Sequence, residues 1–140
     1  MEVDRNGLEV LDREECLRLL ERATLGRVGV TTAALPSVLP VNFRLAGDRI
    51  VFRTGTGTKL AAATRNAVVA FEVDDIDPVN HTGWSVVVTG VARPVVDPDD
   101  LARLNGLGIA RWAAGDDGHV VEVSLEIVSG RRIPPGLPQG

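Results

Sequence analysis

The segment RTGTGTK, from Arg53 to Lys59, carries the side chains best suited to hold an anion. Lys59 is the only lysine among 15 basic residues, and it follows three threonines that alternate with two glycines. Arg53 can grip two anion oxygens, Lys59 adds a compact charge, and Thr54 and Thr58 add hydroxyls, while glycine lets backbone amides approach a ligand. The spacing is not that of a Walker A loop, because Leu60 follows the lysine. The segment predicts a phosphate-binding turn; a plain Gly/Thr turn with solvated basic ends is the alternative.

Such a turn needs a strand before it and a helix after it. IVFRT, residues 50–54, has the composition of a strand, and TKLAAATRN, residues 58–66, reads as a short alanine-rich helix. The first turn of a helix presents unpaired amides and the positive end of the helix dipole. We therefore expect the anion to lie between the end of the strand and the start of the helix.

An amphipathic helix is predicted earlier in the chain. In LDREECLRLLERATLG, residues 11–26, leucines and Cys16 recur on one face. Asp12 can cap this helix with Glu15 three residues later, and Gly26 is expected to end it. Cys16 is the only cysteine, which excludes an internal disulfide, and its place on the apolar face predicts a buried structural thiol.

The rest of the chain reads mostly as strands. Residues 26–54 predict three strands, 67–78 and 82–95 predict two more, and 119–133 predict one final strand. Pro40, inside the second strand, is expected at an edge or a bulge because proline cannot donate to a ladder. Asp97 and Pro98 open a helix over residues 97–110.

Links of hairpin type dominate, so the expected fold is mainly β: a small antiparallel barrel of about six strands with flanking helices. Residues 1–133 are expected to form a single domain. The end of the chain, PPGLPQG at 134–140, is expected to be a flexible tail.

Composition excludes several classes of function. The net charge of −4 argues against general binding of nucleic acid or of an anionic membrane, and no run of residues is long and apolar enough for a membrane span. The acidic start does not resemble a signal peptide, so a cytoplasmic protein is expected. His81 and His119 are far apart in sequence and show no metal-ligand spacing, so no metal site is expected. Trp112 is expected to pack a loop onto the barrel or a partner.

The order of these segments carries a resemblance. A helix is followed by GRVGVTT, LPVNFRL, IVFRTGTGTKL, VVAFEVDDIDPVNHTGWSVVVTGVA and SGRRI. This order resembles the pyridoxamine 5′-phosphate oxidase-like family of flavin-binding split β-barrels over about residues 11–133. The strand–turn–lysine stretch and GWSVVVTGVA carry most of the likeness.

The resemblance implies a homodimer with two flavin mononucleotide (FMN) molecules at the subunit interface. The strand with PVNF would line the flavin ring, the third strand and its turn would hold the phosphate and ribityl chain, and a Trp-Ser pair would approach from a later strand. Arg131 or Arg132 would close the site. The residues implied to contact the cofactor are Val41, Asn42, Phe43, Arg53, Thr54, Thr58, Lys59, Trp84 and Ser85.

The function that the resemblance implies is an FMN-dependent oxidoreductase acting on a small organic molecule. The flavin would do the redox chemistry, so no catalytic residue is assigned. One alternative is a deazaflavin-dependent reductase, whose longer anionic tail favours more basic residues than Arg53, Lys59 and Arg65. Others are a non-catalytic flavin-binding or sensing barrel and a dimeric scaffold with an empty site. The chain lacks an extra basic set for a phosphorylated pyridine, so pyridoxamine phosphate oxidation itself is not implied.

Overall fold

A computed structural model describes residues 1–109 and 118–136, which contain nine strands and three helices. The helices are α1 (Arg13–Arg22), α2 (Lys59–Ala63) and α3 (Pro98–Asn105). The strands are β1 (Glu2–Val3), β2 (Glu9–Leu11), β3 (Leu25–Thr32), β4 (Leu35–Ala46), β5 (Arg49–Thr54), β6 (Ala67–Asp77), β7 (Thr82–Pro94), β8 (His119–Ser124) and β9 (Ile127–Ile133). None of the helices within these described ranges is long and apolar enough to cross a membrane.

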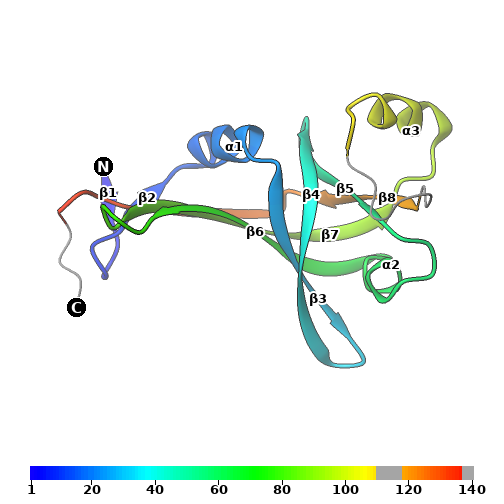
Figure 1. The fold of residues 1–140 in the computed structure, drawn as a ribbon, viewed down its shortest axis with the longest axis horizontal. Coiled ribbons are helices and arrows are strands. Elements are labelled where there is room, and N and C mark those ends of the chain that lie inside the picture. The colour runs from blue at the N-terminus through cyan, green and yellow to red at the C-terminus, as the bar shows by residue number, and fades with distance from the viewer. Residues whose placement is uncertain (110–117, 137–140) are drawn as a thin grey trace.

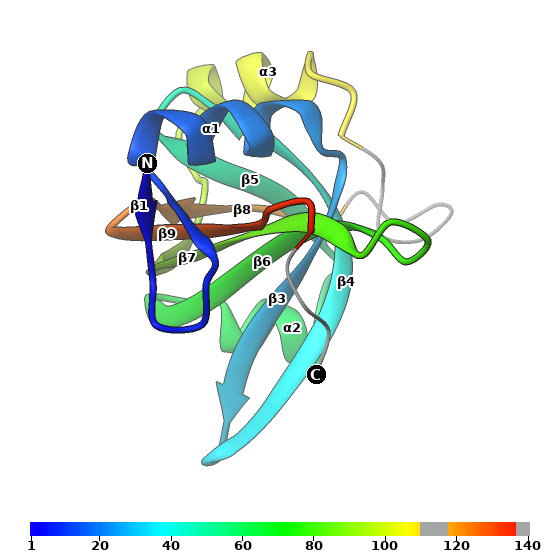
Figure 2. The same ribbon diagram turned by 90° about the vertical axis from the view of Figure 1, so that its left-hand side faces the viewer.

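Six strands close into an antiparallel barrel, which confirms the predicted fold class. Around the ring the hydrogen-bonded order is β3, β4, β5, β8, β7 and β6, and β6 pairs with β3 to complete the circle. The other strands, β9, β2 and β1, continue the sheet outward from β7 and form what we call the wing. Figure 1 shows the wing at one end of an elongated molecule, with α2 and α3 at the other end, and Figure 2 looks along the molecule from the wing.

The barrel and the wing separate at a bulge opposite β7. Val123 pairs with Ala92 and Ile127 pairs with Thr89, so the segment opposite β7 has one residue more than β7 between these two pairs. The prediction of a single strand over 119–133 was therefore wrong: β8 turns into the barrel and pairs with β5, whereas β9 joins the wing. Gly90 lies at this point, where a Cβ atom would stand 1.7 Å from the carbonyl oxygen of Ser124.

The barrel interior is filled by aliphatic side chains around the three phenylalanines of the chain. The rings of Phe43 and Phe71 meet edge to face with centroids 4.8 Å apart, and Phe52 stacks on Phe71 with centroids 6.3 Å apart. These residues come from three different strands, and inward-facing residues alternate with outward-facing residues along each strand. The side chains that fill the core therefore lie at every second position of these strands.

Helix α1 begins as predicted and ends earlier than predicted. The Asp12 carboxylate accepts a hydrogen bond from the backbone amide of Glu15 (2.8 Å), which confirms Asp12 as the cap. The helix ends at Arg22, and Gly26 lies inside β3. The reason for glycine there is contact with the core, because a Cβ atom on Gly26 would stand 2.5 Å from the ring of Phe71.

Ion pairs connect the wing strand β9 to residues near the N-terminus. Strands β1 and β2 were not predicted, and β2 pairs with β9. Arg131 donates to the carboxylate of Asp4 (3.0 Å), and Arg132 donates to that of Glu15 (2.9 Å). Both arginines that were expected near the cofactor therefore fasten the wing in this structure.

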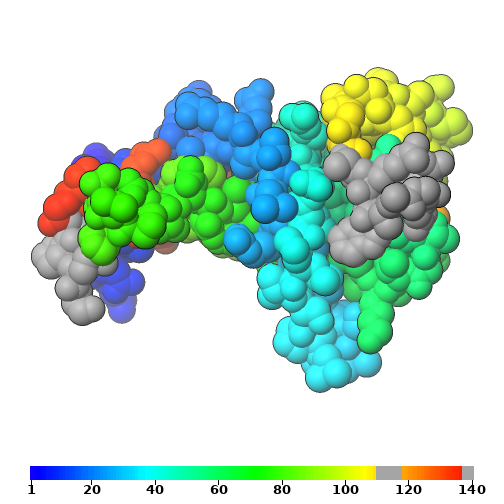
Figure 3. All heavy atoms as spheres, in the orientation of Figure 1, coloured from blue at the N-terminus to red at the C-terminus, as the bar shows by residue number. Residues whose placement is uncertain are grey.

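The β3–β4 hairpin projects from the barrel as an arm, seen below the body in Figure 3. Along β4, only Phe43–Ala46 pair with β5, so among the described residues Pro40 has a ladder partner on the β3 side alone. This confirms the expectation that Pro40 lies at an edge. The turn of the arm is made by Ala33 and Ala34, which both have positive φ angles of 49° and 64°.

Helix α3 covers the outside of the barrel next to β5 and β8. Asp97 accepts from the amide of Asp100 (3.0 Å) and Pro98 follows at the first helical position, which confirms the predicted helix start. A second apolar cluster lies under this helix, separate from the barrel interior. The helix ends at Asn105, so the predicted extent to residue 110 was too long.

Candidate functional site

The turn between β5 and α2 has the predicted strand–turn–helix form. Its geometry depends on Thr58, whose hydroxyl donates to the carbonyl of Gly55 (2.9 Å) and accepts from the amide of Ala61 (3.1 Å). Gly57 has a φ of +72°, and, apart from Gly57 itself and its two chain neighbours, no heavy atom of the described residues lies within 4 Å of the place where its Cβ would be. Thr58 therefore shapes the turn, and the open side of the turn lies at Gly57.

Lys59 is an exposed cation at the first residue of α2. The helix has only five residues, so its dipole is weaker than the sequence suggested. The positive charge at this turn comes mainly from the ammonium group of Lys59 itself. This charge stands beside the open side of the turn at Gly57.

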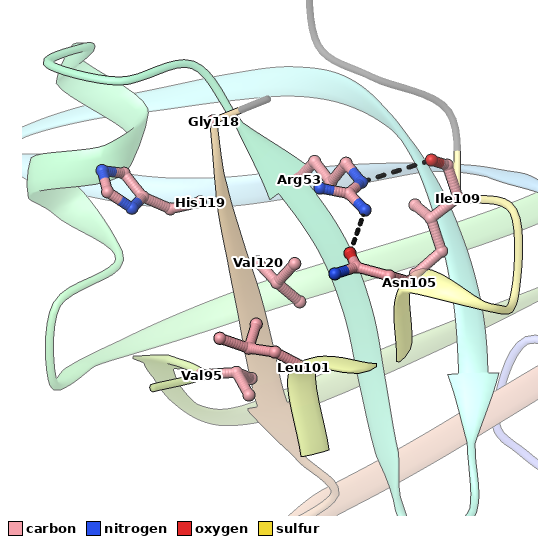
Figure 4. Close-up of a pocket in the computed structure, with 8 residues that line it drawn as sticks. All are labelled: Arg53, Val95, Leu101, Asn105, Ile109, Gly118, His119 and Val120. Atoms are coloured by element: carbon pink, nitrogen blue, oxygen red, sulfur yellow. Dashed lines mark hydrogen bonds between the residues drawn. The ribbon is translucent and has the colours of Figure 1, made fainter. Parts of the chain in front are cut away.

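Arg53 and Thr54 precede the turn on opposite faces of β5. The guanidinium of Arg53 donates to the carbonyl of Ile109 (3.3 Å) and to the side-chain oxygen of Asn105, as Figure 4 shows. These residues line a cavity of about 530 Å³ beside α3. Thr54 points the other way and is fully buried, and its hydroxyl has no hydrogen-bond partner among the described residues. The two side chains therefore do not converge on one point in this chain.

The PVNF segment of β4 places one side chain outward. Val41 and Phe43 are buried in the barrel core, whereas Asn42 between them is exposed. The aromatic surface that was expected for a ring contact is thus turned inward. Asn42 and the backbone edge of β4 are the accessible parts of this segment.

Trp84 and Ser85 lie on opposite faces of β7. Trp84 packs against the barrel core, and Ser85 is on the outer face. Trp84 pairs across the strands with Arg132, and β9 joins the wing, whereas the β5–α2 turn lies at the opposite end of the molecule in Figure 1. One chain therefore does not bring Ser85 or Trp84 to the turn that carries Lys59.

An ion cluster on the outside of the sheet was not foreseen. We call the side of β4, β3, β6, β7 and β9 that is turned away from the barrel interior the outer face. On it, Nη1 of Arg27 lies 3.3 Å from Glu72 and 3.5 Å from Asp74. Burial, together with the adjacent Asp74 carboxylate, raises the pKa of Glu72 to about 7. The spacing E-x-D in a strand places both carboxylates on one face, and this was the signal that the sequence offered.

The cluster stands between two of the predicted cofactor residues. Asn42 on β4 pairs with Leu25, two residues from Arg27 on β3. On the other side, Asp74 pairs directly with Ser85. The outer face thus combines Asn42, the ion cluster and Ser85 on four neighbouring strands.

Other expectations can be placed as well. Cys16 is fully buried, and burial raises the pKa of its thiol, which confirms a buried structural thiol. His81 lies in the β6–β7 turn and His119 begins β8. Trp112 lies outside the described residues.

Comparison with known proteins agrees with this fold. The model of the pyridoxamine 5′-phosphate oxidase family matches residues 12–132. The uncharacterized protein Rv0080 of Mycobacterium tuberculosis is 44% identical over 128 residues, which cover 88% of this chain and 84% of that protein.

Solved structures share the same architecture. An FAD binding protein from Mycobacterium smegmatis is 38% identical and superposes with a TM-score of 0.75, covering 89% of this chain and 97% of the other. An FAD-binding protein from Mesorhizobium loti, at 20% identity, has a TM-score of 0.72 over 91% of this chain and 99% of the other, and this likeness concerns the fold alone. The chain belongs to the pyridoxamine 5′-phosphate oxidase family, with the split β-barrel fold.

Proposed function

We propose that this protein is a flavin-dependent oxidoreductase that acts as a homodimer on a small organic substrate. The observation that carries the proposal is the β5–α2 turn, with exposed Lys59 beside the open position of Gly57, in a chain of this family. A bound flavin supplies the redox chemistry, and the protein binds and orients it. The protein's own residues supply the charge and the shape of the binding site.

The residues of the turn fit the phosphate end of a flavin. Lys59 offers a mobile ammonium group, and Gly57 leaves room for an anion against the backbone. Thr54 precedes the same turn, but its fully buried hydroxyl, which has no partner among residues 1–109 and 118–136, is turned toward the barrel interior.

A second copy of the chain completes the proposed site. Within one chain, Lys59 begins α2 at one end of the molecule, whereas Ser85 pairs with Arg131 of β9, in the wing at the other end, and shares the outer face with Asn42. A two-fold dimer can bring Ser85 of one copy toward the turn of the other, because each copy then contributes a different set of residues to each of two identical sites.

FMN is the cofactor that the resemblance implies. FAD is the second candidate, because the protein from M. smegmatis at 38% identity is described as FAD binding. Both cofactors share the isoalloxazine ring and a phosphate attached to the ribityl chain, so Lys59 is proposed to act in the same way on either.

Titration of the purified protein with FMN, FAD and a deazaflavin, followed by cofactor fluorescence, tests the proposal. We expect one of the two flavins to bind tightly and Lys59→Ala to weaken its binding by roughly 1–3 kcal/mol, or about 5- to 150-fold. Arg22→Ala is the matched control, since Arg22 is an exposed cation at the end of α1. Binding of neither flavin, or an equal loss in both variants, contradicts the proposal.

A mixing experiment tests whether two copies share each site. Ser85→Trp places a bulky ring on the outer face and is expected to block binding, and Lys59→Ala is expected to weaken binding by the factor given above. A mixed dimer of the two variants has one intact site and one site that carries both changes. Recovery of flavin binding on mixing supports the shared site, and no recovery in a mixture shown to contain mixed dimers contradicts it.

A further inference from the structure

We propose that a second copy of this chain docks on the outer face, and that docking takes up one proton at each Glu72–Asp74 carboxylate pair. The inference rests on the homodimer of the proposed function and concerns how its assembly responds to pH. The observation behind it is the arrangement of one arginine and two carboxylates on a face that also carries exposed aliphatic side chains.

The cluster is unbalanced in charge. Arg27 on β3 faces Glu72 directly across the strands, and its Nη1 atom contacts both Glu72 and Asp74. Side-chain exposure is 31% for Glu72 and 32% for Asp74, so the carboxylates are already partly withdrawn from water. One positive charge against two negative charges leaves each copy with one excess negative charge at this place.

Among the described residues, the rows of Glu72 and Asp74 on the neighbouring strands hold no unpaired cation. On β7, the residues opposite Glu72 and Asp74 are Val87 and Ser85. On β9, one strand further, Ser129 and Arg131 follow in the same rows, and Arg131 is bound to Asp4. On β4, Pro40 stands opposite Arg27. Glu72 therefore meets only Arg27 and Asp74 as charged partners among the described residues of these strands.

The surface around the cluster is apolar and exposed. A hollow of about 260 Å³ lies at the cluster and is lined also by Gly29, Val38 and Ala70. Exposed aliphatic side chains continue the surface on the same face of β3, β4, β6, β7 and β9: Leu25, Val38, Val68, Val87 and Ile127. Contiguous exposed apolar surface of this kind marks an interaction site.

A second copy is the partner that this surface fits. An isologous contact requires a self-complementary patch, and a patch that holds both Arg27 and an acidic pair can face its own copy across a two-fold axis. The assembled patch then holds two arginines and four carboxylates, with water removed by the surrounding aliphatic side chains. Uptake of one proton per carboxylate pair makes this patch neutral, which a low-dielectric surrounding favours.

The direction of the effect follows from linkage. In the single chain, burial and then Asp74 already raise the pKa of Glu72 to about 7. Docking removes more water and raises this pKa further, so the dimer binds more protons than two separate copies. Dimer formation is therefore favoured at low pH and weakened as the pH rises through the pKa of Glu72.

Sedimentation equilibrium without added flavin, between about pH 5.5 and pH 8.5, tests the inference. We expect the dimer dissociation constant to increase by roughly tenfold or more over this range. Glu72→Gln imitates the protonated carboxyl group, and Asp74→Asn leaves one carboxylate for one arginine, so both variants are expected to dimerise without this pH dependence. Glu21→Gln, an exposed carboxylate on α1, is the control that keeps it.

Several outcomes would overturn the inference. The proposed docking surface would be contradicted by a monomer at every pH, or by a Val38→Arg variant that dimerises as tightly as the native chain. The proposed proton uptake would be contradicted by a dimer dissociation constant that does not change with pH, or by a pH dependence that is retained in Glu72→Gln. Flavin titration of the same samples separates these failures from failure of the proposed function, because a chain that binds flavin without a pH-dependent dimer contradicts only the inference made here.

Discussion

Arg49 on β5 holds Asp100 on α3 by two parallel hydrogen bonds. Nη2 lies 2.6 Å from Oδ1 and Nη1 lies 2.7 Å from Oδ2, while Nη1 also contacts Glu122 on β8 at 2.5 Å. This fork joins the barrel wall to the helix that covers it. Bidentate, partly buried pairs of this kind are stronger than ordinary surface ion pairs.

The Arg49–Asp100 pair predicts a loss of stability in acid. Arg49 lowers the pKa of Asp100 to about 2, below the value of about 3.9 for an unfolded chain. The stabilisation is thus fully present above about pH 4 and is lost as the pH falls toward 2. In urea unfolding, Asp100→Asn should be less stable than the native chain at neutral pH, and the difference should shrink below about pH 4. Asp99→Asn, in the same helical turn, is the control, and a difference as large at pH 2.5 as at neutral pH would refute the prediction.

The bulge at which barrel and wing separate predicts that replacing Gly90 lowers the stability of the protein. A Cβ atom there would stand 1.7 Å from the Ser124 carbonyl, so Gly90→Ala forces the backbone apart at the bulge. We expect a loss of about 2–4 kcal/mol in the free energy of unfolding, measured at fixed protein concentration. At Gly29, the nearest atom would be 3.7 Å away, and Gly29→Ala should change stability by less than about 1 kcal/mol. Equal effects of the two substitutions would show that the bulge does not need glycine.

The arm carries strain that a substitution can relieve. Ala33 and Ala34 both adopt positive φ angles, which alanine disfavours and which Asn-Gly adopts readily in a two-residue hairpin. Replacing the pair by Asn-Gly should raise the free energy of unfolding by about 1 kcal/mol. Ala62→Gly, at an exposed position of α2, should lower it by a similar amount. A loss of stability in the Asn-Gly variant would mean that the turn is held by contacts of the alanines.

Cys16 should be unreactive while the chain is folded. Its side chain is fully buried, and burial raises the pKa of the thiol, so little thiolate forms and reagents cannot reach it. Labelling with a thiol reagent at pH 8 should be about 100-fold slower than in urea, because it requires opening of the α1–β9 contact. Ser37→Cys, on the exposed arm, should label rapidly in the Cys16→Ser background. Rapid labelling of native Cys16 would show that α1 opens easily.

Local patterns predicted most of the fold. The structure confirms the helix caps at Asp12 and Asp97, the hairpin links between strands and the edge position of Pro40. Each of these features depends on residues that are close together in the sequence. Gly26 and the 119–133 segment were misread because their conformations depend on distant contacts: the ring of Phe71 in one case and the register along β7 in the other.

The candidate site was less predictable than the fold. The turn and the outward position of Asn42 follow from strand period and glycine content, so a sequence can suggest them. Successive side chains of a strand point to opposite faces. A sequence can therefore also suggest that Arg53 and Thr54 point in opposite directions, and that Trp84 and Ser85 do the same. The cluster of Arg27, Glu72 and Asp74 could not be foreseen, because the pairing of β3 with β6 brings together residues 45 and 47 positions apart.

The pairing of β2 with β9 has a consequence for synthesis of the chain on the ribosome. β2 leaves the ribosome well before its partner β9, and Asp4 meets Arg131 across 127 positions. The β1–β2 hairpin therefore lacks its partner until β9 has been translated. The pairing of β2 with β9 can form only once β9 has been translated, so a chain truncated before β9 should keep a barrel with a frayed, protease-sensitive N-terminus.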